Sequence, residues 1–229
     1  MADGRFKRVL VKISGEVLMG RKDFGLDMDM LARIAGEVAA AVRAGHEVGL
    51  VIGGGNIFRG VAGVASGMER TSADGLGMLA TVMNAIAVAG ALEKQGVPAL
   101  VMSAVAMEPI ARGFDQRAAD AHLKAGGVVI FAAGTGHPFF TTDSGAALRA
   151  LQMGCDAMLK GTSVDGVYAA DPKTDPAAQR FATISYTEVL KRDLKIMDAT
   201  AIALARDNGL PLVVFSIREA GALADVLRG

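Results

Sequence analysis

Short β-rich runs alternate with helix-like segments along the chain, and this alternation limits the possible folds more than any other feature. The β-rich runs cover 9–14, 47–52, 99–103, 127–133, 156–160 and 212–216, and the helical patterns cover 26–45, 75–96, 115–126, 143–154, 199–208 and 219–227. This order predicts a mainly parallel sheet with helices on both faces. We therefore expect an α/β fold, a three-layer αβα sandwich formed by a single domain over residues 1–229.

The composition excludes several classes of protein. The chain has 24 Lys and Arg residues against 24 Asp and Glu residues, which argues against a general nucleic-acid binder but leaves room for a small phosphorylated ligand. Cys155 is the only cysteine, so no disulfide can form within the chain and a reducing compartment is expected. We found no signal peptide and no apolar run of about 18 residues, so we expect a cytoplasmic protein without a membrane span.

Polar and glycine-rich loops follow four of the predicted strands. They are Ser14-Gly15, Gly53–Gly55, Gly134–Gly136 and Gly161-Thr162. In such sheets ligands bind beyond the carboxyl ends of the strands, so these loops are expected to meet at one edge. Glycine allows backbone N–H groups to approach an anion closely, which favours a phosphate-binding edge.

Two basic residues lie near these loops. Lys12 shares a strand face with Leu10 and Ser14, and it either meets phosphate or faces solvent at an edge strand. Arg59 follows the Gly53–Gly55 run and could bind phosphate oxygens in a forked geometry. The G-x-x-x-x-G-K-[ST] pattern of a P-loop is absent, and a G-x-G-x-x-A string at 75–80 lacks the preceding strand that dinucleotide binding requires.

The stretch G-T-G-H-P-F-F-T-T-D-S-G-A at 134–146 carries backbone-exposing glycines, hydroxyls and two aromatic rings. This set suits an anionic substrate with a flat ring. Phe139 and Phe140 either sandwich a base or fill the core. Asp74, Asp143 and Asp198 each precede a predicted helix, where they either cap it or hold Mg2+, a lysine or sugar hydroxyls. The three histidines are scattered, so no metal site built by the protein is expected.

The predicted helix 75–96 is apolar nearly all round, which indicates a buried helix. A homo-oligomer interface and a plain core helix are both compatible with this pattern. A polar, turn-rich segment at 160–172 offers Tyr168 to stack on a purine, and Thr162 and Asp171 to form hydrogen bonds.

Taken together, these motifs resemble the amino acid kinase superfamily and, within it, the bacterial uridylate (UMP) kinases. The motifs are K-I-S-G-E, V-I-G-G-G-N-I-F-R-G, G-M-L-A-T-V-M-N, G-T-G-H-P-F-F-T-T-D-S, V-D-G-V-Y-A-A-D-P and K-I-M-D, and they cover nearly the whole chain. The resemblance implies the amino acid kinase fold and reversible transfer of the ATP γ-phosphoryl group to UMP, with Mg2+, in pyrimidine nucleotide biosynthesis.

The resemblance also implies roles for individual residues. The implied catalytic residues are Lys12, Asp143 and Asp198. ATP would lie against Lys12, Ile13, Ser14, Gly15, Gly55, Arg59, Lys160, Thr162, Tyr168 and Asp171. UMP would lie against Gly54, Asp74, Thr135, Gly136, His137, Pro138, Phe139, Phe140, Thr141 and Thr142.

Members of this family form homohexamers, and many are activated by GTP and inhibited by UTP. The segment G-R-K-D-F-G-L-D at 20–27 resembles a stretch linked to the GTP response. Two alternatives stay open: a sister kinase that acts on a carboxylate or carbamate, which T-G-H-P-F-F-T-T-D disfavours, and a regulator or storage protein that binds ATP without turnover.

Overall fold

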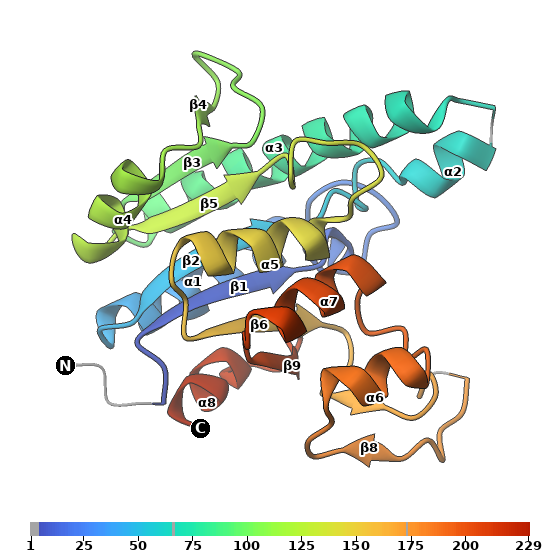
Figure 1. The fold of residues 1–229 in the computed structure, drawn as a ribbon. Helices are drawn as coiled ribbons and strands as arrows, with labels where there is room; N and C mark the ends of the chain where they lie inside the picture. The colour runs from blue at the N-terminus through green and yellow to red at the C-terminus, as the bar shows by residue number, and fades with distance from the viewer. Residues whose placement is uncertain (1–4, 66, 173) are drawn as a thin grey trace.

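The computed structural model describes residues 5–65, 67–172 and 174–229, and a parallel sheet forms the centre of this part of the chain (Figure 1). Its seven strands follow the order β4-β3-β5-β2-β1-β6-β9, and every neighbouring pair is parallel. The strands are β1 (Arg8–Ile13), β2 (Glu47–Ile52), β3 (Ala99–Ser103), β4 (Arg112–Gly113), β5 (Val128–Ala132), β6 (Ala157–Thr162) and β9 (Leu212–Ser216). The prediction of a mainly parallel sheet is confirmed.

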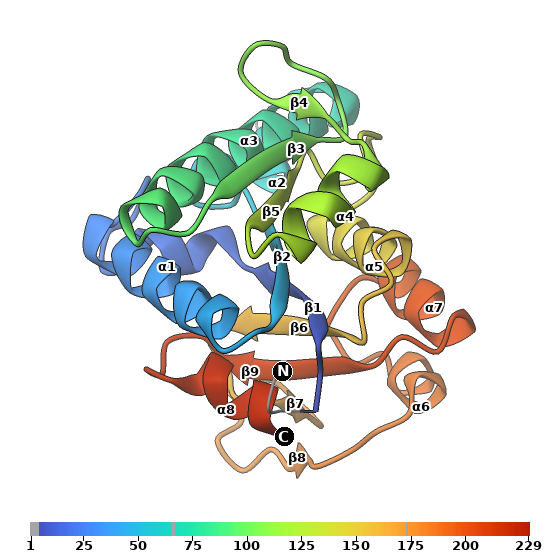
Figure 2. The ribbon, with the colours of Figure 1, turned by 90° about the vertical axis from the view of Figure 1, so that its left-hand side faces the viewer.

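Helices cover both faces of the sheet, as Figure 2 shows with α1 and α3 on one side and α4, α5 and α7 on the other. The first face carries α1 (Met28–Arg43), α3 (Arg70–Lys94) and α8 (Ala222–Arg228). The second face carries α4 (Gln116–Lys124), α5 (Thr142–Gln152), α6 (Tyr186–Lys191) and α7 (Ala199–Asp207). The predicted three-layer αβα sandwich is therefore confirmed.

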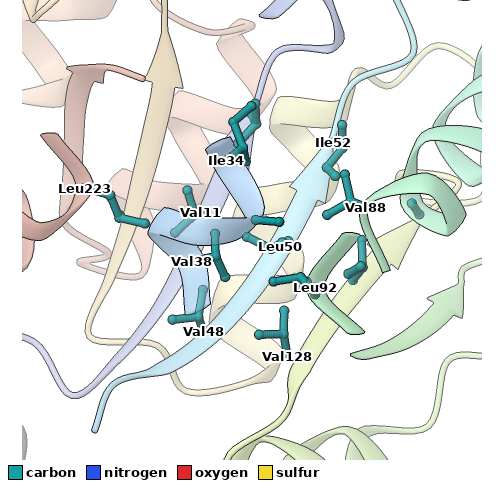
Figure 3. Packing of buried hydrophobic residues seen from close by; sticks show 14 of the residues in the cluster. Val11, Ile34, Val38, Val48, Leu50, Ile52, Val88, Leu92, Val128 and Leu223 are labelled. Carbon is teal, nitrogen blue, oxygen red and sulfur yellow. The ribbon is translucent and has the colours of Figure 1, made fainter. Parts of the chain in front are cut away.

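Side chains of each strand alternate between the two layers, because successive residues of a strand point to opposite faces. In β1, Val9 and Val11 join the core under α1 and α3, whereas Leu10 joins the core under α5 and α7. Figure 3 shows the first of these cores, in which strand residues pack against Ile34 of α1 and Leu92 of α3. By the same alternation Lys12, two residues after Leu10, lies on the α5 and α7 face.

Helix α3 begins at Arg70, five residues before the predicted start at 75. Asp74 was expected just before this helix and instead lies inside it. An ion pair between Arg70 and Asp74, one turn apart at 2.8 Å, supports the additional turn.

Only one side of α3 is buried within the single chain. By length and mean hydropathy this helix could cross a membrane, and the core helix of a soluble protein passes the same test. Ala80, Val88 and Leu92 are buried against the sheet. Its outer side stays exposed in the single chain, at Leu76, Leu79, Met83 and Ile86.

Several small elements lie outside the predicted ones. The 3-10 helix η1 (Gly15–Met19) follows β1, and α2 (Gly60–Ala65) precedes α3. The polar segment 161–184 contains an antiparallel pair, β7 (Val167–Tyr168) and β8 (Arg180–Phe181). Ser185 caps α6, with its hydroxyl oxygen accepting from the Glu188 N–H at 3.2 Å.

Candidate active site

The glycine loops after β1 and β2 pack against each other at the carboxyl edge of the sheet. A Cβ atom at Gly15 would lie 2.4 Å from the carbonyl oxygen of Gly53. A Cβ atom at Gly54 would lie 2.8 Å from Ala80 and 2.9 Å from the carbonyl oxygen of Gly77, both on α3. These positions therefore require glycine, because any side chain would separate the two loops or push α3 away.

Two lysines on adjacent strands converge on one carboxylate. Lys12 of β1 is paired in register with Lys160 of β6, so both side chains leave the same face of the sheet side by side. Lys12 Nζ lies 2.8 Å from Asp143 Oδ1, and Lys160 Nζ lies 2.7 Å from Asp143 Oδ2. Lys160 Nζ also donates to the carbonyl oxygen of Ile196 at 2.5 Å. This Lys12–Asp143–Lys160 cluster is the most strongly charged buried group at the sheet edge.

Asp143 sits in the first turn of α5 and does not cap it. The cap is Thr141, whose hydroxyl oxygen accepts from the Asp143 N–H at 3.0 Å. The Asp143 carboxylate is therefore available to form ion pairs with Lys12 and Lys160. Its Oδ1 has close ionic contact with Lys12 but no well-aligned hydrogen bond.

Burial and neighbouring charges shift the pKa values of this cluster in opposite directions. Burial raises the pKa of Asp143, but the ammonium groups of Lys12 and Lys160 outweigh it and hold that pKa below its ordinary value. Burial lowers the pKa of Lys160, and Asp143 offsets part of that effect. Two lysines share one carboxylate, so an excess of positive charge is held where water is largely excluded.

A cleft of about 130 Å³ lies beside this cluster, between α3 and the 134–142 loop. Of the residues predicted to bind UMP, those that line this cleft are Gly54, Asp74, Thr135, His137, Phe140, Thr141 and Thr142. Gly55, predicted beside the donor phosphates, lines the same cleft. Gly136, Pro138 and Phe139 do not line it. Phe139 is 65% exposed and Phe140 47% exposed, so neither ring fills the core.

Asp74 joins α3 to the 134–142 loop. Its carboxylate accepts from Arg70 Nε at 2.8 and 2.9 Å and from the Phe139 N–H at 2.7 Å. The Arg70 guanidinium also lies 5.5 Å from the centre of the Phe139 ring. Asp74 therefore fixes one wall of the cleft against the other.

Several residues of this cleft were not predicted. They are Phe58, Gly60, Ala73, Gly77, Met78, Thr81 and Ala133, whereas Gly134 belongs to a predicted ligand loop. Thr81 also supports the wall, because its hydroxyl oxygen accepts from the Ala133 N–H at 2.8 Å. Most of these residues lie within or beside the motifs quoted above. The motifs therefore indicated the segments that form the cleft wall, but not which of their residues line it.

A second cleft, of about 430 Å³, is lined by residues that include Thr162, Tyr168 and Asp171. The Tyr168 hydroxyl donates to Asp165 at 2.5 Å, and this hydrogen bond raises the pKa of Tyr168. Ile196 lines this cleft and binds Lys160 through its carbonyl, whereas Thr142 lines the first cleft and neighbours Asp143 in the chain. The charged cluster therefore adjoins lining residues of both clefts.

Asp198 reaches the cluster indirectly. Its carboxylate caps α7 by accepting from the Ala201 N–H at 2.9 Å, and it also accepts from the hydroxyls of Ser144 at 2.9 Å and Thr141 at 2.5 Å. It thereby ties α7 to the first turn of α5. Ser144 was not predicted, although it stands beside Asp143 in a quoted motif.

The remaining residues that were predicted to bind ATP surround the first glycine loop. Ile13 is buried in the core, and the Ser14 N–H donates to the carbonyl oxygen of Gly161 at 3.4 Å. Arg59 is exposed and forms an ion pair of 3.0 Å with Glu16, while its Nε donates to the carbonyl oxygen of Gly55 at 3.2 Å. Its guanidinium is thus held at the mouth of the loop.

Comparisons with known proteins agree with this geometry. A family model described as the amino acid kinase family matches residues 7–216. A uridylate kinase of Erythrobacter litoralis is 59% identical over 229 residues, which is 100% of this chain and 96% of that protein. A uridylate kinase of Zymomonas mobilis is 60% identical over 98% of this chain and 93% of its own length.

Solved structures with the same arrangement include a UMP kinase from Bacillus anthracis. It superposes with a TM-score of 0.91 at 38% identity, over 94% of this chain and 89% of that one. A UMP kinase from Ureaplasma parvum gives a TM-score of 0.91 at 38% identity, over 97% of this chain and 95% of its own. The chain therefore belongs to the amino acid kinase family and, within it, to the uridylate kinases.

Proposed function

We propose that this protein is a UMP kinase that transfers the γ-phosphoryl group of ATP reversibly to UMP, giving ADP and UDP. The observation that carries the proposal is the largely buried Lys12–Asp143–Lys160 cluster, which adjoins lining residues of two clefts of unequal size. A phosphoryl group passing between two nucleotides needs such a positive centre, with a binding site on each side.

Catalysis here rests on positioning and charge. The acceptor is already an anionic phosphate, so no strong general base is needed. Lys12 and Lys160 would neutralise charge on the transferred group, and Asp143 would hold the two ammonium groups at a fixed separation. Because the cluster is largely buried, each charge acts in a medium of lower dielectric than water and needs little rearrangement during the reaction.

The two clefts suit different nucleotides. We assign the larger cleft to ATP, with Tyr168 available for the purine and with Thr162 and Asp171 for hydrogen bonds. We assign the smaller cleft to UMP, with Asp74 and the hydroxyls of the 134–142 loop available for ribose and base. We assign the phosphates of both nucleotides to the backbone of two loops, Ser14–Gly15 and Gly53–Gly55. Arg59 lies beside these loops and is available to bind phosphate oxygens.

We propose Mg2+ as the metal of this reaction. Among the described residues, no group of three or more His, Cys, Asp or Glu side chains could hold a metal ion. The oxygens of Asp143 already meet lysines, and those of Asp198 already accept hydrogen bonds. This set fits an ion that arrives coordinated by ATP phosphates, as Mg2+ commonly does, where it would neutralise phosphate charge.

The proposal extends to assembly and regulation. We propose a single domain over residues 1–229 that works in the cytoplasm and assembles as a homohexamer; the exposed apolar side of α3 supports a self-association surface. We also propose GTP as an activator and UTP as an inhibitor, on the family resemblance of residues 20–27. Size-exclusion chromatography with light scattering tests the assembly, and titration with each nucleotide tests the regulation.

The direct test is release of ADP from Mg-ATP by the purified protein, with UMP, CMP, dUMP, GMP, AMP, aspartate and acetylglutamate offered in parallel. Turnover with UMP well above turnover with every other acceptor is the expected result. Turnover with aspartate or acetylglutamate alone would establish a sister kinase instead. Tight ATP binding without ADP release from any acceptor would establish a nucleotide-binding regulator.

A further inference from the structure

Two fully buried asparagines face each other behind the glycine loop. Asn56 directly follows Gly53–Gly55 and is 1% exposed, and Asn84 lies on α3 and is 0% exposed. Asn84 Nδ2 donates to Asn56 Oδ1 at 2.6 Å, and Asn56 Nδ2 donates to Asn84 Oδ1 at 3.0 Å. The two side-chain amides therefore form a reciprocal pair, like a base pair, inside the protein.

The second N–H of each amide reaches a loop. Asn84 Nδ2 donates to the carbonyl oxygen of Gly53 at 2.7 Å, and Asn56 Nδ2 donates to the carbonyl oxygen of Gly25 at 3.0 Å. The backbone adds a return bond from the Gly25 N–H to the carbonyl oxygen of Asn56 at 2.9 Å. All four amide hydrogens are thus used, which offsets the cost of burying two polar groups.

This pair touches the parts of the fold that must be held in register for phosphoryl transfer. A Cβ atom at Gly15 would lie 2.6 Å from Asn56 Oδ1, so the first glycine loop packs directly on the amide pair. The same Cβ atom would lie 2.4 Å from the carbonyl oxygen of Gly53, which Asn84 anchors, so Gly15 packs on the amide pair and on Gly53 together. Movement of either amide would therefore change how the two loops present their backbone to the substrates.

We propose that Asn56 and Asn84 are positioning residues for the transfer reaction, a role that rests on the proposed kinase function. They contact neither cleft. They act by fixing the carbonyl of Gly53, and with it the Gly53–Gly55 backbone, against Gly15 on one side and α3 on the other. A misplacement of about 1 Å in such a site lowers the rate by about 100-fold, so two well-directed amide bonds suffice to affect turnover.

The test uses Asn84→Asp, which keeps the size of the side chain and removes both N–H donors. Asn56 Nδ2 can still donate to the new carboxyl group, but the bond to Gly53 is lost. We expect kcat to fall at least about 10-fold at pH 8, with KM for UMP and for ATP within about 3-fold of wild type. Burial raises the pKa of such a carboxyl group, so protonation at lower pH restores one donor. The ratio of variant to wild-type kcat should therefore rise as the pH is lowered from about 8 to about 6.

His46→Ala is the matched control. His46 is also buried and hydrogen-bonded, with Nδ1 2.8 Å from the carbonyl oxygen of Phe6, but it precedes β2 at the opposite edge of the sheet. We expect it to lower Tm while kcat and both KM values stay close to wild type. The kcat values are compared per folded protein, with the folded fraction taken from thermal unfolding.

The outcomes separate the two proposals. If the wild-type protein does not phosphorylate UMP, the proposed function is wrong, and the role given to the asparagine pair is wrong with it. If the wild type is active and Asn84→Asp lowers Tm without changing kcat, as the control does, the asparagine pair has a purely structural role. That result overturns the inference. Should Asn84→Asp fail to fold, Asn56→Asp replaces it. That variant keeps both donors of Asn84 but loses the bonds from Asn56 Nδ2 to Asn84 Oδ1 and to the carbonyl oxygen of Gly25, so kcat should fall by about 3- to 10-fold with both KM values near wild type; an unchanged kcat would overturn the inference.

Discussion

Replacement of Lys12 by alanine gives the sharpest test of the charged cluster. Lys12 is 7% exposed, and its Nζ lies 2.8 Å from Asp143 Oδ1. In Lys12→Ala the Asp143 carboxylate keeps Lys160 at 2.7 Å, so the variant leaves no unpaired buried charge. We therefore expect a stability loss below the roughly 3–5 kcal/mol that follows when a buried ion pair is broken outright.

The effect on the reaction should be larger than the effect on folding. Loss of one preorganised group that stabilises transition-state charge costs about 2.7–4 kcal/mol, which corresponds to a fall of about 100- to 1,000-fold in kcat. The assay is ADP release with saturating Mg-ATP and UMP, with Tm measured on the same preparation. Lys12→Met is the matched variant, because it keeps most of the apolar stem and removes only the charge.

The two variants together give a clear decision. Equal, large losses in kcat for Lys12→Ala and Lys12→Met would assign the effect to the ammonium group. Recovery of activity in Lys12→Met alone would assign it to packing. A kcat within 10-fold of wild type in both folded variants would refute the role of Lys12 in the transfer.

Three further predictions concern the supporting structure. Gly15→Ala places a Cβ atom 2.4 Å from the carbonyl oxygen of Gly53, so kcat should fall by about 10-fold or more with a lowered Tm; wild-type kinetics would show that the loops can separate freely. Burial raises the pKa of Glu37 despite the nearby Arg33, so its contribution to stability is present at low pH and is lost as the pH rises through the folded-state pKa. The unfolding free energy of wild type relative to Glu37→Gln, measured with urea, should thus increase from about pH 7 to about pH 4, and a constant difference would contradict this assignment. Asp198→Ala removes a helix cap worth about 1 kcal/mol and should lower Tm by at least about 2–4 °C; an unchanged Tm would argue against the capping role.

Much of the fold could be predicted from the sequence because its signals are local. Strand and helix patterns alternate on the scale of single elements, and parallel strands bring their carboxyl ends to one edge. This was enough to gather the glycine loops, Lys12 and Asp143. The predicted start of α3 was wrong by five residues, and the Arg70–Asp74 ion pair stabilises the turn that the prediction left out.

The rest depended on contacts between distant segments. The register of β1 on β6 sets Lys12 beside Lys160, and no spacing in the sequence encodes that register. Asn56 and Asn84 are 28 residues apart and became partners only when α3 packed on the glycine loop. A helix cap was one of the two interpretations of Asp198, and the structure shows that cap; its additional hydrogen bond to Ser144 depends on how α5 and α7 meet.

Helix α3 presents two kinds of surface along 25 residues. Its inner side carries Thr81 and Asn84 to the acceptor wall and the glycine loop, and its outer side leaves Met83 and Ile86 exposed. The same helix therefore joins the surface that we propose for self-association to the wall of the first cleft. A second copy packed on the outer side of α3 would also restrain that wall, so assembly and the shape of the cleft depend on one helix.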